Sequence, residues 1–195
     1  QVPGKRSLRT CGSHRFISHR KVRVFLAQQM EGMAARQDTE YEGVPLSQMT
    51  PALRGLRIEE IAFEVNRMLH PNCSLSRTSS KVDWVRGEVR VEVKHGMMRF
   101  NKGQRERRWW CSFRNIKCDL FDELWLAIYS PFGIHFLKHP GGQVRFSLTG
   151  LREEARGKEM HVLGGQNVID AREALDEMVQ KMEAWGCQAL ATILW

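Results

Sequence analysis

The stretch KVDWVRGEVRVEVKHG, Lys81–Gly96, decides the fold, because valines and charged residues alternate on both sides of one glycine. Alternation with a period of two is typical of a half-buried β-strand. A two-residue turn at Arg86-Gly87 would fold two such strands into a hairpin. We therefore predict a β-hairpin in which Asp83 pairs with Arg90.

Charged side chains gather on one face of this hairpin. Glu92 and Lys94 lie two residues apart on the return strand, and Asp83 is diagonal to Glu92, roughly 7–8 Å away between backbones. Carboxylate oxygens are the ligands that Mg²⁺ prefers, and a lysine beside the ion can orient an attacking water. One interpretation is phosphodiester hydrolysis at a divalent metal. The other is an amphipathic hairpin whose solvated charges form only cross-strand pairs.

The order of these residues resembles the PD-(D/E)XK nuclease superfamily, which has the restriction-endonuclease-like fold. V-D at residues 82–83 and V-E-V-K at residues 91–94 match its aspartate, second acid and lysine, although Val82 stands where the family has proline. The stretch RGLRIEEIAFEV, residues 54–65, is similar to the helix that supplies a further glutamate in that family. The resemblance covers residues 54–140 and implies Glu59 for this role, with Glu60 as the alternative.

The resemblance implies a Mg²⁺- or Mn²⁺-dependent endonuclease that cuts duplex DNA at a site, as restriction or homing enzymes do. It implies Asp83, Glu92 and Glu59 as metal ligands, and Lys94 as the group that positions water and steadies the phosphate. One alternative is a junction-resolving or repair nuclease of the same fold. Others are a basic nucleic-acid-binding protein that does not cut, and an RNA-associated domain of an organelle.

Positive charge is concentrated in two parts of the chain. The formal net charge is +8, which favours a polyanionic partner. Blocks of Lys and Arg predict a basic arm over residues 1–23 and a basic, aromatic loop over residues 99–117. An alternative for the tryptophans of this loop is burial in the core. The residues predicted to contact nucleic acid are Arg20, Lys21, Arg23, Arg99, Lys102, Gln104, Arg105, Arg107, Arg108, Trp109 and Arg114.

The rest of the chain predicts one domain over residues 24–195, of mixed α/β class, with a central sheet flanked by helices. Helical spacing of apolar residues predicts helices near 50–70 and 171–185. No apolar run approaches the ~20 residues of a membrane helix, and five cysteines without a CxxC pair speak against a zinc site. We therefore expect a soluble intracellular protein. The apolar stripe of the last helix predicts core packing, with a homodimer contact as the alternative.

Overall fold

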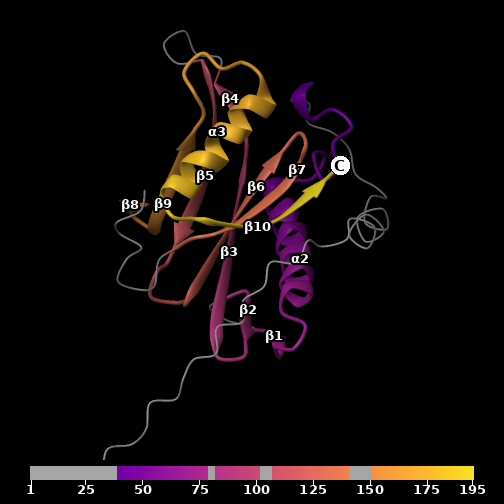
Figure 1. Ribbon diagram of the computed structural model, residues 1–195, viewed down its shortest axis with the longest axis vertical. Helices are drawn as coiled ribbons and strands as arrows, with labels where there is room; N and C mark the ends of the chain where they lie inside the picture. Colours follow the sequence, from indigo (N-terminus) through magenta and orange to yellow (C-terminus); the bar gives the residue numbers. More distant parts are fainter. Residues whose placement is uncertain (1–38, 79–81, 102–106, 141–150) are drawn as a thin grey trace, which may run out of the picture.

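The computed structural model describes residues 39–78, 82–101, 107–140 and 151–195. Within these ranges the chain forms a six-stranded sheet, a four-stranded sheet and two α-helices (Figure 1). The predicted mixed α/β class, with a central sheet flanked by helices, is confirmed. The elements are η1 (Thr39–Tyr41), α2 (Pro51–Leu69), β1 (Leu75–Arg77), β2 (Trp84–Arg86), β3 (Val89–Met97), β4 (Arg99–Asn101), β5 (Arg108–Ile116), β6 (Glu123–Ser130), β7 (Gly133–Lys138), β8 (Leu151–Glu154), β9 (Gly157–Leu163), α3 (Ala171–Ala184) and β10 (Gln188–Leu194).

The six-stranded sheet has the order β1-β2-β3-β6-β7-β10. β3 and β6 are parallel, whereas the other neighbouring strands are antiparallel. The central strand β6 is apolar on both faces, because Leu124 and Leu126 join one buried cluster while Trp125 and Ala127 join the other. A strand buried on both faces is expected where a parallel pair lies at the centre of a sheet.

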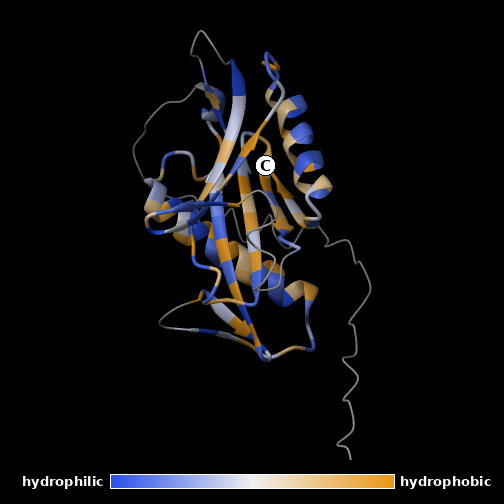
Figure 2. Ribbon diagram, turned by 90° about the vertical axis from the view of Figure 1, so that its left-hand side faces the viewer, coloured by the Kyte–Doolittle hydropathy of each residue, from blue (hydrophilic) through white to orange (hydrophobic). Residues whose placement is uncertain are grey.

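Two hydrophobic clusters cover the two faces of this sheet. On one face α2 packs its apolar stripe, including Ile58, Ala62 and Val65, against β2, β3 and β6. On the other face α3 and the four-stranded sheet pack against β6. Figure 2 shows that both helices are hydrophobic on one side and hydrophilic on the other, as one-sided packing requires. No helix in the described part of the chain is both long and apolar enough to cross a membrane.

Local signals in the sequence set the ends of both helices. The Thr50 side chain accepts a hydrogen bond from the Leu53 amide, and Pro51 occupies the first turn of α2. Asp170 accepts two amide hydrogen bonds at the start of α3, of 2.9 and 2.8 Å. Gly186, with φ of +88°, follows the end of α3. The predicted helices near residues 50–70 and 171–185 are therefore confirmed.

The predicted register of the β2–β3 hairpin is wrong by one turn residue. Trp84 pairs with Val91 and Arg86 with Val89, so that the turn consists of Gly87 and Glu88. Gly87 occupies the first turn position with φ of +61°, which glycine adopts at no steric cost. The correction moves every cross-strand pair by two residues, and an even shift leaves each side chain on its predicted face.

The predicted basic loop over residues 99–117 is mostly two strands of a second sheet. Here β4 and β5 pair with β9 and β8 in the order β4-β5-β9-β8. β3 touches this sheet at Gly96, where an added Cβ would lie 2.6 Å from the Ser112 carbonyl oxygen and 2.4 Å from Cys111 Sγ. Glycine is therefore required at this contact, which holds the two sheets together.

Candidate active site

Asp83 lies just before β2 and is fixed by the backbone of β3. Its amide donates to the Val91 carbonyl at 3.2 Å, and its Oδ2 accepts from the Val93 amide at 2.6 Å. The β2–β3 ladder ends at Val91. Beyond it, the Asp83 side chain and not a backbone carbonyl accepts the hydrogen bond from β3. The register of β2, continued by one residue, places Asp83 opposite Glu92 rather than diagonal to it.

Glu92 and Lys94 form an ion pair on the face of β3 that Asp83 shares. Their side chains keep exposed fractions of only 14% and 24%. The parallel register aligns Glu92 with Leu124 and Lys94 with Leu126, both of which belong to the buried cluster on that face. The ion pair therefore borders apolar side chains and is largely withdrawn from water.

The next side chain of the strand, His95, points to the opposite face. It packs against α2, where a Cβ added at Gly55 would lie 2.5 Å from His95 Cε1. Burial lowers the pKa of His95, which favours a neutral imidazole. The expected alternation of β3 therefore holds through the whole polar segment.

The two candidate helix carboxylates have different surroundings. Glu60 accepts a hydrogen bond from Arg57 at 2.6 Å, three residues away along α2. Glu59 makes no such pair with a described residue, and it lies within electrostatic range of Asp83, Lys94 and Glu92. The fold therefore brings four ionisable groups from α2, the start of β2 and β3 near one another, at the edge of β3 that β2 leaves uncovered.

Burial is the main cause that raises the pKa of the three carboxyl groups above their ordinary values. For Glu59 the pKa rises to about 7, because the negative charge of Asp83 adds to burial. Burial also raises the pKa of Asp83, against the Val93 hydrogen bond and Lys94. The pKa of Glu92 is raised by burial, against the charge of Lys94. Burial thus favours the protonated form of each of these carboxyl groups, in spite of the positive charge of Lys94.

Two further cations lie within electrostatic range of the cluster, of which Lys117 falls in the predicted basic loop and Arg77 was not predicted. Behind the dominant effect of burial, Arg77 at the end of β1 lowers the pKa of Glu59 and Asp83, and Lys117 just after β5 lowers that of Glu92. Neither belongs to the motif, and both come close only through the fold. Their basic charge is the one signal that the sequence carried for them.

The donor set suits a hard divalent cation. Carboxylate oxygens at the edge of a sheet, backed by apolar side chains, are the ligands and setting that Mg²⁺ takes beside a phosphate. In the part of the chain that the structure describes, no three Asp, Glu, His or Cys groups are already close enough to ligate one ion. An ion held by one or two of these carboxylates would complete its shell with water and phosphate oxygens, as Mg²⁺ usually does.

The residues predicted to contact nucleic acid have separate placements. Arg99, Arg107 and Arg114 are exposed, and Arg108 is partly buried on β5. Trp109 is 3% exposed and its indole N–H donates to the Ile169 carbonyl at 2.8 Å, so this ring belongs to the core and is not available for base contact. The remaining predicted residues lie outside the described ranges: Arg20, Lys21, Arg23, Lys102, Gln104 and Arg105.

No protein-family model matches the chain, and no curated protein matches it. Among solved structures, the chain is similar to a bacterial homing endonuclease, I-Ssp6803I, with 18% sequence identity and a TM-score of 0.33. The match covers 70% of this chain and 96% of that chain. At these values it defines no residue-by-residue correspondence.

Proposed function

We propose that this protein is a metal-dependent endonuclease that hydrolyses phosphodiester bonds of duplex DNA at Asp83, Glu92, Lys94 and Glu59. The observation that carries the proposal is the placement of Asp83 and the Glu92–Lys94 ion pair together at the open edge of β3, with Glu59 of α2 within electrostatic range. Half-buried carboxylates with raised pKa values are costly, and such clusters are concentrated at functional sites. The solvated-hairpin alternative accounts for neither the burial nor the gathering of charge.

Two of the carboxylates each keep an oxygen that is not used in the hydrogen bonds of this site. Asp83 uses only Oδ2, and Glu92 only Oε1, in hydrogen bonds with other described residues. Each carboxylate therefore keeps one oxygen for another ligand. A bound Mg²⁺ or Mn²⁺ would supply charge neutralisation and a more acidic water at this edge. Positive charge would also relieve the repulsion between Glu59 and Asp83 that contributes to the raised pKa of Glu59.

The protein's own groups have distinct roles in this proposal. The Val93 amide fixes one oxygen of Asp83 and leaves the other without a hydrogen bond from this amide. Glu92 holds the Lys94 ammonium group in place. Lys94 would orient the attacking water and donate to the phosphate oxygens as charge develops on them. Arg77 and Lys117, at the rim, would bind the flanking phosphates as point charges.

The excess of positive charge supports nucleic acid as the substrate. A formal net charge of +8 raises the local concentration of a polyanion and lets it release bound counterions. Site-specific cutting in the restriction or homing manner is the finer form of the proposal. Cutting both strands requires two copies of the site, which a homodimer would supply.

The test is cleavage of supercoiled plasmid DNA with Mg²⁺, with Mn²⁺ and with EDTA. We expect nicked and linear products with either metal and none with EDTA, and mapping of the ends reports whether cutting is site-specific. Lys94→Ala should abolish cleavage but keep DNA binding. Arg90→Ala is the matched control, because Arg90 lies on the same face of the same strand but is solvent-exposed and paired with Asp122. DNA binding without any metal-dependent cleavage would instead identify a non-catalytic binding protein.

A further inference from the structure

One face of the four-stranded sheet is apolar and buried, and the other face is polar. Along β5, Trp109, Cys111 and Phe113 are buried in the cluster that α3 covers. The alternate residues Trp110 and Ser112 are only half-buried. Arg114 continues the polar face and is exposed. Strand alternation therefore directs a row of aromatic, hydroxyl and guanidinium groups away from the core.

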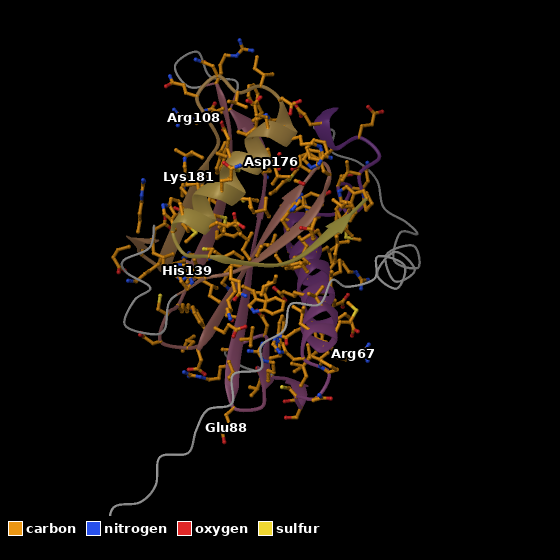
Figure 3. All side chains as sticks on the ribbon, viewed as in Figure 1. Arg67, Glu88, Arg108, His139, Asp176 and Lys181 are labelled. Atoms are coloured by element: carbon orange, nitrogen blue, oxygen red, sulfur yellow. The ribbon has the colours of Figure 1, made fainter. Side chains whose placement is uncertain are left out.

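β4 and the first part of β5 extend this pattern into a two-stranded ribbon at the edge of the sheet. Arg99 pairs with Trp110 and Asn101 with Arg108, so these four side chains share the polar face. On the opposite face the rings of Phe100 and Trp109 pack at 5.3 Å between centroids. Figures 1 and 3 place this ribbon, with Arg108, at one end of the molecule.

β9 continues the polar face beside β5 and holds its side chains in place. His161 lies opposite Ser112, and its ring stacks on Trp110 with a centroid separation of 6.0 Å and an interplanar angle of 18°. Glu159 accepts from Arg114 at 2.6 Å and from His161 at 2.8 Å. Side chains anchored in this way lose little rotamer freedom when they bind a partner.

The chemistry of this face fits duplex DNA. Guanidinium, imidazole, hydroxyl and amide groups are the ones that bind base edges and phosphates. Neighbouring strands lie about 5 Å apart, so a two-stranded ribbon with its side chains fits the major groove of B-DNA, which is about 12 Å wide. The major groove of an RNA duplex is too deep and narrow for such a ribbon. Cations outnumber acids on the polar face of the four-stranded sheet when β8, the neighbour of β9, is included. The cations are Arg99, Arg108, Arg114 and Arg152, and the acids are Glu154 and Glu159.

We propose that the polar face of β4, β5 and β9 docks in the major groove of duplex DNA, with Arg99, Ser112, Arg114 and His161 facing the bases and phosphates. This inference rests on the proposed function, because it takes DNA as the substrate. One packing contact and one chain connection link the face to the candidate site. Gly96 of β3 packs against the Ser112 carbonyl, and Lys117 directly follows β5. A duplex bound on this face is therefore held at a fixed position relative to the carboxylates.

The test uses the full chain with EDTA, so that binding is measured without cleavage. Duplexes that the wild-type protein binds are first selected from a random pool and then treated with dimethyl sulfate. This reagent methylates guanine N7 in the major groove and adenine N3 in the minor groove, so one experiment reports on both. We expect protection of guanine N7 alone. Protection confined to adenine N3, or failure to enrich any duplex, would overturn the proposal.

A matched pair of variants assigns the binding to this face. Arg114→Ala should weaken binding about tenfold and reduce the salt dependence of log K by about one. Arg67→Ala on α2 is the control, because both arginine side chains are highly exposed, at 61% and 67%, and both pair with a glutamate. Equal DNA affinity of the two variants would contradict the proposed docking face, even if the protein cuts DNA. DNA binding on this face without metal-dependent cleavage would instead contradict the proposed nuclease function and leave the docking proposal standing.

Discussion

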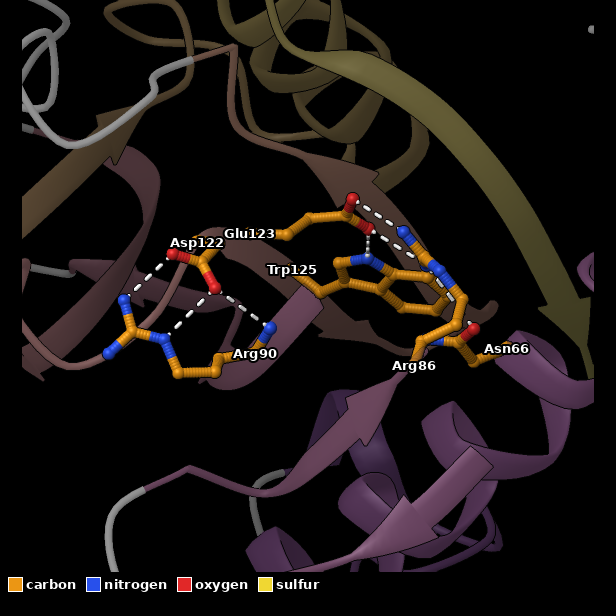
Figure 4. A network of polar contacts seen from close by, with 6 residues as sticks. All are labelled: Asn66, Arg86, Arg90, Asp122, Glu123 and Trp125. Carbon is orange, nitrogen blue, oxygen red and sulfur yellow. Dashed lines mark hydrogen bonds and ion pairs between the residues drawn. The ribbon is translucent and has the colours of Figure 1, made fainter. Parts of the chain in front are cut away.

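Two groups of charged residues lie on opposite faces of the same strands, and they differ in how far their charges are balanced. On the α2 face, Arg86 of β2 and Glu123 of β6 form a buried ion pair. Trp125 and Asn66 complete its hydrogen bonds, as Figure 4 shows. Asp83 and the Glu92–Lys94 pair lie on the other face, and Glu59 of α2 is within electrostatic range of them without an ion-pair partner of its own among the described residues.

The pKa values of the carboxylates differ in the same way between the two groups. Burial alone would raise the pKa of Glu123, but hydrogen bonds from Arg86 and Trp125 bring it below its ordinary value. Glu123 receives the Trp125 indole N–H at 2.6 Å and an Arg86 guanidinium N–H at 2.8 Å. Glu59 has no comparable donor among the described residues, and its pKa rises to about 7.

Similar burial therefore has opposite consequences for the two groups. A carboxylate that accepts from a bidentate arginine and an indole N–H links β2 to β6 across β3. Both of its oxygens already accept hydrogen bonds, so it has none left for a ligand. A partly buried carboxylate without such donors among the described residues costs folding free energy, and a bound cation would lower that cost. Burial without strong hydrogen-bond donors is thus the better indicator of function, because a fully hydrogen-bonded ion pair is already explained by structure.

The largest effect is expected from Asp83→Asn. The asparagine side-chain oxygen can still accept from the Val93 amide, so the fold is kept while the charge is lost. Cleavage of plasmid DNA should fall about 10²–10⁴-fold, the usual size for a group that acts in the reaction. The control is Asp122→Asn, at a pair with Arg90 that is more than one third exposed on both sides. Equal loss of activity in the two variants would contradict the assignment of the site.

Glu123→Ala breaks the balanced group and should act on stability instead. Removing the carboxylate leaves Arg86 buried without its partner, which costs about 3–5 kcal/mol of unfolding free energy. Urea denaturation followed by circular dichroism measures this loss. The double variant Arg86→Met/Glu123→Leu should recover most of it, since it leaves no buried charge. If the double variant is as unstable as the single one, the ion pair is not what Glu123 contributes.

The faces of the hairpin could be predicted from sequence, but its register could not. Alternation alone placed Asp83, Glu92 and Lys94 together, and this survived because the register error was two residues. The position of the turn depends on which residue takes positive φ. Gly87 does so as the first turn residue, whereas the prediction had placed it second.

The second sheet was missed although its signal is present in the sequence. Trp109, Cys111 and Phe113 alternate with polar residues, which is the period of a half-buried strand, but the density of arginines around them favoured a loop. The partner strand β9 lies more than 40 residues further along the chain, and no local pattern identifies such pairing.

Glu59→Gln should alter the pH dependence of stability. The folded pKa of about 7 lies above the ordinary value of 4.5, so the folded state binds the proton more tightly than the unfolded state. Stability is therefore lost as pH rises from 4.5 to 7 and stays low above 7. After allowance for solvent screening, we expect the variant to be about 1–2 kcal/mol more stable than wild type at pH 8 but not at pH 4.

Urea unfolding at several pH values measures this effect. The unfolding free energy of the variant should still fall with pH, but less steeply, because the pKa values of Asp83 and Glu92 are raised as well. Glu60→Gln serves as the matched control on the next residue of α2, where the carboxylate is paired with Arg57. The same gain at pH 8 from both variants would show that the carboxylate cluster is not the cause.

The smallest effect is expected at the exposed pair of Arg90 and Asp122. Asp122 accepts hydrogen bonds from the Arg90 side chain at 2.7 and 2.9 Å, which lower the pKa of Asp122. Its geometry is as good as that of Arg86 and Glu123, but water and salt screen both partners. Arg90→Ala should therefore leave the urea midpoint within measurement error at physiological salt. A loss as large as that of Glu123→Ala would mean that hydrogen-bond geometry, and not burial, makes an ion pair of this sheet structurally important.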